Sequence, residues 1–137
     1  MDGYILRSEA GKEASLSPQE FISISQANAW GLNKNYDLIK VKEALEATFL
    51  TITIRNSKNE LCACLRALSD DLFFTSIPDI FVLPELHRKG LGTWMMEELK
   101  KRVGHTAIFF GAQPGNEAFF EALGFEKGIQ SYQGKFR

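Results

Sequence analysis

The chain has 137 residues, with 16 Lys and Arg against 17 Asp and Glu, a formal net charge of −1 and 45% hydrophobic residues. This length and composition predict one globular domain over residues 1–137, whose core needs neither disulfides nor a structural metal. The absence of a basic excess argues against binding of nucleic acid, and no apolar run approaches the roughly 20 residues that cross a bilayer. Because residues 1–4 lack the basic and apolar regions of a signal peptide, we expect a cytoplasmic protein that does not bind membranes.

The first half of the chain predicts a strand, two helices and a hairpin. Residues 4–7 are a short β-prone run. Ser17-Pro18-Gln19-Glu20 matches a capping box at the start of a helix over about 18–29, and an apolar stripe predicts a second helix over about 37–47. Alternation of apolar and polar residues then predicts paired strands over 50–54 and 61–67.

The second half predicts a long central strand followed by alternating helices and strands. Residues 72–83 form an apolar run in which Pro78 requires a bulge, a bend or an unpaired edge. Helical spacing follows over 91–103. A short strand over 106–110, a helix over 116–123 and a last strand beginning at Phe125 complete the order. This order predicts an α+β fold, a mixed sheet with helices on both faces.

Two cysteines, Cys62 and Cys64, lie two residues apart in the second strand of the hairpin. No second cysteine pair and no neighbouring histidine would complete a tetrahedral zinc site. We therefore expect two buried strand residues and no metal.

Residues 81–93 contain a strand, a turn and the start of a helix, an arrangement suited to binding an anion. Gly90 and Gly92 allow main chain to approach a ligand, and the free amides and dipole of the helix start favour negative charge. Arg88 and Lys89 add positive charge. The turn therefore predicts a site for phosphate or pyrophosphate, with an ordinary glycine-containing loop as the alternative.

Two common nucleotide motifs do not fit this turn. A Walker P-loop needs Lys and then Ser or Thr after its second glycine, where this chain has Thr93-Trp94. A dinucleotide-binding fingerprint needs a third glycine, where this chain has Met95.

A second segment, residues 109–125, allows a more specific interpretation of the glycine turn. Together with the turn His87-Arg88-Lys89-Gly90-Leu91-Gly92 it resembles the GCN5-related N-acetyltransferases, or GNAT family. In that family a Gln/Arg-x-x-Gly-x-Gly/Ala turn holds the pyrophosphate of coenzyme A, and a downstream Asn-x-x-Ala-x-x-Phe-Tyr-x-x-x-Gly-Phe-like helix flanks the pantetheine. The resemblance covers residues 72–127 and is strongest to small stand-alone bacterial and plastid acetyltransferases. It implies a mostly antiparallel sheet of about six strands with a splayed central strand.

The resemblance implies that acetyl-CoA is the cosubstrate, with no metal, and that the acetyl group passes directly to a primary amine in a ternary complex. The amine would belong to a small molecule or a peptide, and homodimers are common in the family. Main chain of the central strand would bind the pantetheine and polarise the thioester carbonyl. The residues implied in coenzyme A binding are Phe81, Val82, Leu83, His87, Arg88, Lys89, Gly90, Leu91, Gly92, Thr93, Asn116, Phe119 and Phe120.

The catalytic candidates are Asp79 and Tyr132. Asp79 lies just ahead of the implied coenzyme-binding stretch and is our candidate to accept the proton of the amine, with a strand-end carboxylate bonded to main chain as the alternative. Glu85 is the weaker candidate base. The family's usual general acid is the Tyr of its Phe-Tyr pair, where this chain has Phe120. Tyr132 is the candidate substitute, with packing or acceptor contact as the alternative, and a thiolate is also able to leave unassisted.

The first two helices and their loop are expected to bind the acceptor. Trp30 and Tyr36 are the candidate residues, with Asn33 and Asn35 beside them, and Trp30 is equally well suited to a core position. An aromatic lining would suit an aralkylamine or another apolar amine. Two other functions stay open: a non-catalytic acyl-CoA-binding regulatory domain, which Phe120 favours, and a protein that binds ATP on the glycine turn.

Overall fold

The computed structural model describes residues 1–32 and 34–136. One sheet has the strand order β1-β2-β3-β4-β5. Its strands are β1 (Tyr4–Glu9), β2 (Leu50–Asn56), β3 (Leu61–Ser69), β4 (Phe74–Val82) and β5 (Ala107–Phe109). The α-helices of the described residues are α1 (Pro18–Ala27), α2 (Leu38–Glu46), α3 (Leu91–Val103) and α4 (Glu117–Ala122), and short 3-10 turns are η1 (Gly11–Glu13) and η2 (Pro84–Leu86).

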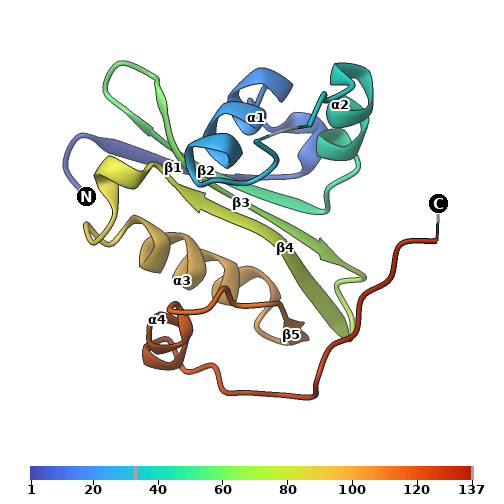
Figure 1. The fold of residues 1–137 in the computed structure, drawn as a ribbon. Helices are drawn as coiled ribbons and strands as arrows, with labels where there is room; N and C mark the ends of the chain where they lie inside the picture. The colour runs from blue at the N-terminus through green and yellow to red at the C-terminus, as the bar shows by residue number, and fades with distance from the viewer. Residues whose placement is uncertain (33, 137) are drawn as a thin grey trace.

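Helices cover both faces of the sheet, with α1 and α2 on one face and α3 and α4 on the other (Figure 1). On the α3 side, the inward residues of β2 and β3 pack against the buried stripe of α3. On the opposite side, Cys64 and Phe81 pack against Ile24 of α1 and Leu45 of α2. Burial on both faces explains why β2 is buried through nearly its whole length. The predicted α+β fold with helices on both faces is confirmed.

The pairing of β4 leaves part of one edge open. β1 to β4 pair antiparallel, whereas β5 runs parallel to β4 and pairs only with Phe74–Ser76. Between Arg66 and Leu68 the register shifts, so that Ile77 and Pro78 lie opposite one residue of β3. This is the irregularity that Pro78 predicted, because proline cannot donate to a ladder. Beyond Ser76, no described strand pairs with the outer edge of β4.

Two predicted boundaries were wrong for identifiable reasons. The central strand begins at Phe74 and not at Leu72, because the carboxylate of Asp70 accepts hydrogen bonds from three successive main-chain N–H groups and holds a turn there. The strand predicted from Phe125 is not formed within residues 125–136. Ile129, Tyr132 and Phe136 in this segment are 86%, 90% and 95% exposed, so they add nothing to the core that would hold a strand in place.

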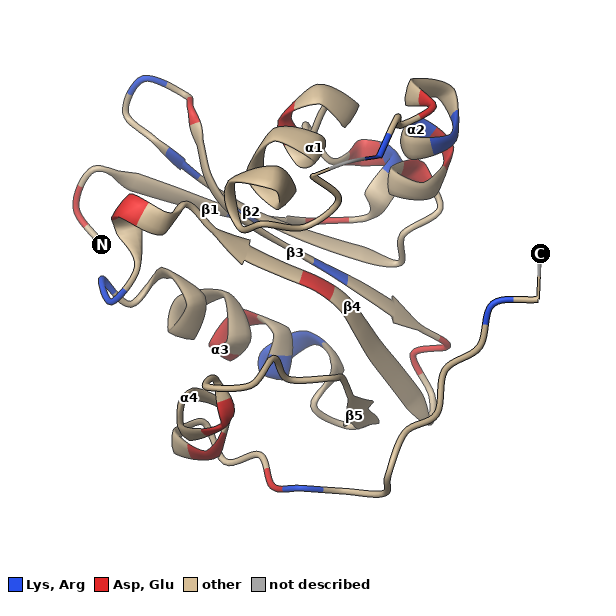
Figure 2. Cartoon of the chain, in the orientation of Figure 1, with Lys and Arg blue, Asp and Glu red and all other residues tan. Residues whose placement is uncertain are grey.

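Charged residues are interspersed along the chain, with no large face of one sign in the view of Figure 2. None of the helices in residues 1–32 and 34–136 has the length and apolar composition of a membrane-spanning segment.

Candidate active site

At alternate residues of β4, the main-chain N–H and C=O groups point to its open edge. The pairing with β3 determines which residues these are. The N–H of Leu83 donates to the carbonyl of Cys62 at 2.9 Å, which makes these two residues a hydrogen-bonded pair. Because such pairs alternate in an antiparallel ladder, Phe81 also turns its main chain toward β3. The main chain of Ile80 and Val82 therefore points away from β3, into the gap left by β5.

Because of this alternation, the three predicted residues Phe81, Val82 and Leu83 do not all face the open edge. Val82 presents its main chain to the open edge, whereas Phe81 and Leu83 use theirs within the sheet and pack their side chains on the α1 side. Ile80 shares the open edge and was not among the predicted residues. Sequence offers no signal for it, because the register of the strand pair sets the parity.

The open edge of β4 leads into the glycine turn. Gly90 is the N-cap of α3 with φ +86°, and Arg88 has φ +66°, so the chain bends through two left-handed residues. The carbonyl of Gly90 accepts from Trp94, the first helical hydrogen bond, and no side chain caps the helix. The N–H groups of Leu91, Gly92 and Thr93 precede that bond, and Arg88 and Lys89 are exposed beside them. The turn therefore presents main-chain N–H groups without intrahelical acceptors, the feature on which the prediction of an anion site depends.

Helix α4 packs against the start of α3, where Phe119 lies next to Gly92. A Cβ atom added at Gly92 would lie 3.2 Å from Cζ of Phe119, so even a methyl group there would require the Phe119 ring to shift slightly. Asn116 is the N-cap residue of α4 and makes no side-chain capping bond. Phe120 is buried against Phe110 and Phe119, with ring centroids 4.5 and 5.0 Å apart. The position at which the family carries tyrosine is therefore filled by a packed apolar ring.

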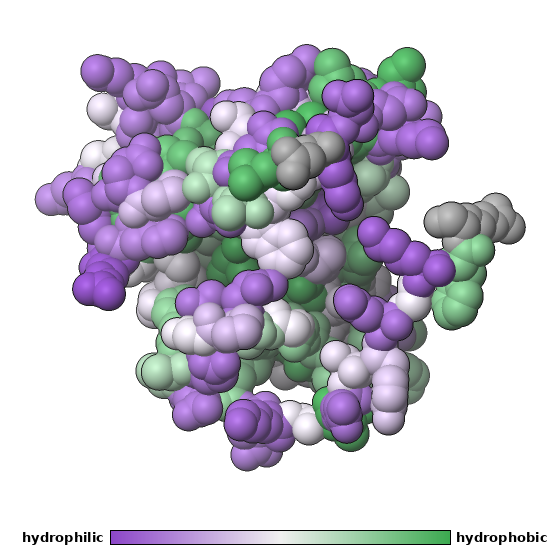
Figure 3. Space-filling view, viewed as in Figure 1, coloured by the Kyte–Doolittle hydropathy of each residue, from purple (hydrophilic) through white to green (hydrophobic). Residues whose placement is uncertain are grey.

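A hollow of about 660 Å³ lies between the end of α1, β4 and the segment before α4. Figure 3 shows hydrophobic surface between the more hydrophilic outer parts of α1 and α4. Among the described residues, Asp79 is the only ionisable one in its lining. The lining residues are Asn28, Trp30, Ser76, Ile77, Pro78, Asp79, Ile80, Phe81, Met96, Phe110, Gly111, Ala112, Gln113, Asn116 and Phe120.

Asp79 is held by an arginine on the neighbouring strand. Nε of Arg66 donates to Oδ2 of Asp79 at 2.6 Å, and Nη2 lies 2.5 Å from the same oxygen. The two side chains are 15% and 19% exposed, and the two residues lie opposite each other in the pairing of β3 with β4. Arg66 is itself fixed by Thr48 and by the ring of Phe21. Within the described residues only Oδ2 carries a hydrogen bond, so Oδ1 is the oxygen that a ligand or water would meet.

The other predicted residues are spread more widely. Trp30 lines the hollow. Tyr36 packs its hydroxyl on the main chain of Gly31, next to Trp30, and is not part of the lining. Tyr132 lies in the exposed carboxy-terminal segment and is not among the residues that line the hollow. Asn33 lies outside the described residues, and Glu85 is exposed in η2.

The cysteines are not placed for nucleophilic chemistry. Cys62 and Cys64 are both buried and free. Desolvation raises the pKa of both thiols, that of Cys64 to about 12, so the reactive thiolate is suppressed near neutral pH. The expectation of buried strand residues is confirmed.

Comparisons with known proteins identify the family of this chain. The Acetyltransferase (GNAT) domain family matches residues 47–127, more than half of the chain. The chain is 30% identical over 105 residues to an uncharacterized N-acetyltransferase ycf52 of Gracilaria tenuistipitata var. liui, and 31% identical over 105 residues to that of Porphyra purpurea. These alignments cover 72% of this chain and 58% and 60% of the relatives. The chain thus spans about three fifths of the length of these relatives.

Solved structures share the fold. A putative acetyltransferase from Deinococcus radiodurans R1 superposes with a TM-score of 0.79 at 16% identity, over 98% of this chain and 90% of that one. An aminoglycoside acetyltransferase from an uncultured soil metagenomic sample superposes with a TM-score of 0.73 at 18% identity, over 98% of this chain and 99% of that one. With the extent of the family match, the open edge of β4 and the glycine turn, this chain belongs to the GNAT acetyltransferase family.

Proposed function

We propose that this chain, as one N-acetyltransferase domain, transfers the acetyl group of acetyl-CoA directly to a primary amine in a ternary complex. One observation carries the proposal: the unpaired edge of β4 is followed, through η2 and the glycine turn, by the uncapped start of α3. An extended ligand that carries an anion at one end and amides along its length fits this edge. The free N–H groups and Arg88 and Lys89 would bind the diphosphate, and main chain of β4 would bind the pantetheine.

The proposed reaction depends mainly on main-chain groups and needs few catalytic side chains. The amine nitrogen attacks the thioester carbon, the new C–N bond forms, and the C–S bond breaks to release a thiolate. The outward N–H groups of Ile80 and Val82 are donors for the oxyanion that develops on the carbonyl, and loss of one such donor typically costs about 10²–10³ in rate. Binding both reactants side by side supplies much of the remaining acceleration.

The proton of the amine is assigned to Asp79, directly or through water. Asp79 lines the hollow, and Arg66 fixes its Oδ2, so the carboxylate is held in one orientation and Oδ1 keeps its hydrogen-bonding capacity. Phe120 has no proton to give, so the thiolate departs unassisted. A thiolate is stable enough for this, because a thiol pKa is near 8.5.

The hollow favours an acceptor with one amino group on an apolar body. Its only carboxylate is already neutralised by Arg66, and its walls include Trp30 and Phe110. A polycationic acceptor would need a more negative pocket. The acceptor proposed is therefore a small apolar monoamine or the amino group of a peptide with an apolar neighbour.

The proposal is tested by calorimetry with acetyl-CoA and by thiol release against a panel of amines. We expect binding, and release of coenzyme A only when an amine is present. The buried cysteines of the protein should not contribute to the thiol signal. Binding without release for every amine would support a second function, a non-catalytic acyl-CoA-binding domain, which the buried Phe120 favours. Displacement of coenzyme A by ATP at equal concentration would instead indicate a nucleotide-binding protein.

The role of Asp79 is tested by Asp79→Asn. If the carboxylate accepts the proton, turnover at neutral pH should fall about 10²-fold, within the usual range for loss of a general base. The loss should shrink as the pH rises, because solvent then deprotonates the amine. Thermal unfolding of the variant controls for damage from leaving Arg66 unpaired. A pH–rate profile with the same shape as that of the wild type would remove Asp79 from the mechanism.

A further inference from the structure

The outward-facing carbonyl of Val82 is already hydrogen-bonded to two side chains. Nδ2 of Asn28 donates to it at 3.1 Å, and Nε2 of His87 lies 2.9 Å away. A carbonyl oxygen only accepts, so the histidine nitrogen must carry the proton. Because a carbonyl has two lone pairs, these two donors occupy it fully.

The two donors are anchored very differently. Asn28 is half-buried at the end of α1, and its amide nitrogen also donates to the carbonyl of Ile24 at 2.9 Å. Both of its N–H groups therefore bind carbonyls, which fixes the orientation of the side chain. His87 is exposed and makes its one side-chain contact from the first position of the glycine turn. Water replaces the contact of His87 readily, whereas release of Asn28 would break its hydrogen bonds to two main-chain carbonyls at once.

We propose that Asn28 is a positioning residue that fixes the Val82 carbonyl at the edge of β4, and that His87 is a placeholder on the same oxygen. An amide N–H of the pantetheine arm would replace His87 when acetyl-CoA binds, while Asn28 stays in place. This inference rests on the proposed function, because it needs the arm to lie along β4. It assigns the two side chains opposite effects on the same ligand.

The test separates binding of the arm from binding of the diphosphate. ADP carries the diphosphate but lacks both the arm and the 3′-phosphate of coenzyme A. Because the 3′-phosphate is the same in every comparison, a change between variants in the ratio of the dissociation constants for ADP and acetyl-CoA reports a change in what the arm adds. Calorimetry gives both constants for each variant. Changes at the diphosphate, including any made by His87 itself, largely cancel in this ratio.

The expected results have opposite signs. In Asn28→Ala the ratio should fall about five- to tenfold, the size of one lost hydrogen bond. In Asn28→Asp, which keeps the shape of the side chain but removes its N–H donors, the ratio should fall at least as far. In His87→Ala the ratio should rise about two- to fivefold, because the arm no longer competes with a protein donor.

Gln26→Ala is the matched control. Gln26 lies on the last turn of α1, and its side chain donates to the carbonyl of Gly31 and not to a carbonyl of β4. It should leave the ratio unchanged, which shows that a general loosening of this turn does not lower it. Equal ratios in the wild type and both Asn28 variants, or a lower ratio in His87→Ala, would overturn the inference. If the wild type bound acetyl-CoA no better than ADP, the proposed function itself would fail.

Discussion

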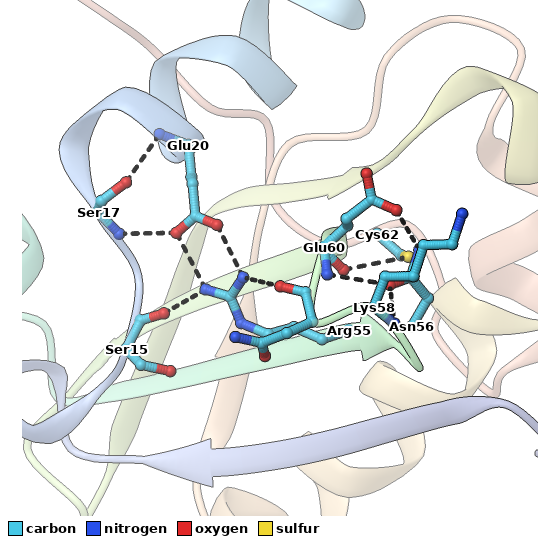
Figure 4. A network of polar contacts seen from close by, with 9 residues as sticks. Ser15, Ser17, Glu20, Arg55, Asn56, Lys58, Glu60 and Cys62 are labelled. Atoms are coloured by element: carbon cyan, nitrogen blue, oxygen red, sulfur yellow. Dashed lines mark hydrogen bonds and ion pairs between the residues drawn. The ribbon is translucent and has the colours of Figure 1, made fainter.

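At the residue scale, the most constrained charged group is Arg55 on β2, which ties α1 to the sheet (Figure 4). Its guanidinium donates to Glu20 through two bonds of 2.7 and 3.0 Å and also to the carbonyls of Asn59 and Ser15. Glu20 in turn closes the capping box with Ser17. One carboxylate therefore both starts α1 and anchors it, and α1 carries Asn28 at its other end.

The ion pair makes stability depend on pH in a predictable direction. The hydrogen bond from Arg55 lowers the pKa of Glu20 below its ordinary value of 4.5. A lowered folded-state pKa means that the unfolded chain takes up a proton first as the pH falls. The stabilisation is therefore complete above pH 4.5 and is lost as the pH falls below it, through the folded-state pKa.

Glu20→Gln tests this pair without removing the cap, because glutamine also serves at this position of a capping box. The free energy of unfolding in urea should fall by about 1–2 kcal/mol at neutral pH, a value discounted for the partial exposure of Glu20. The difference from the wild type should vanish in acid. Glu46→Gln is the control, since its pair with Lys42 is exposed and should be worth less than about 0.5 kcal/mol. A difference that persists at low pH would contradict the linkage.

At the scale of elements, the glycine turn needs a positive φ at Gly90 and, for an anion site, no negative charge at the start of α3. Different substitutions test these two requirements separately. Gly90 has φ +86°, and a Cβ added there would meet nothing within 4 Å. Alanine at this position should thus cost about 1–2 kcal/mol of backbone strain without a clash. Glutamate should cost a similar strain and also place a negative charge at the start of α3.

We therefore expect Gly90→Glu to weaken binding of coenzyme A much more than Gly90→Ala, although both unfold at similar urea concentrations. Gly3→Ala is the matched control, because Gly3 also has a positive φ of +81° and open space around it but lies far from the turn in sequence. It should reduce stability and leave binding unchanged. Equal affinities of Gly90→Glu and Gly90→Ala for coenzyme A would count against an anion site at this turn.

The sequence predicted correctly the elements that depend on interactions between residues close together in the chain. Alternation gave β2 and β3, and Ser17 with Glu20 gave the start of α1, because each signal lies within a few residues. The details of the site depend on partners distant in sequence. The register with β3 makes Ile80 face the open edge, and Arg66 pairs with Asp79 only because the hairpin aligns them. Asn28 reaches Val82 across 54 positions of sequence, and no pattern reports such a contact.

At the scale of the whole molecule, the shortness of β5 creates the site. Three residue pairs join β5 to β4, and the strands then separate where Ile77 and Pro78 bulge. A longer parallel pairing would cover the main chain of Ile80 and Val82. The bulge, the proline and the short strand thus act together, and the loop before α4 fills the far side of the gap.

The carboxy-terminal segment adds little to this body, so its removal is informative. Phe125 packs on Phe110 with ring centroids 5.1 Å apart, whereas Ile129, Tyr132 and Phe136 are almost fully exposed. Truncation after Lys127 should therefore change the free energy of unfolding by no more than about 0.5 kcal/mol. Amine-dependent thiol release should also persist, because Tyr132 lies outside the hollow.

The same truncation decides whether a tyrosine replaces the missing general acid. If release of coenzyme A slows strongly while its affinity and the stability stay constant, Tyr132 must reach the thioester in the ternary complex. Tyr132→Phe in the full chain would then reproduce the loss, since it removes only the hydroxyl. If both variants turn over like the wild type, the thiolate leaves without help, and the packed ring of Phe120 is compatible with catalysis.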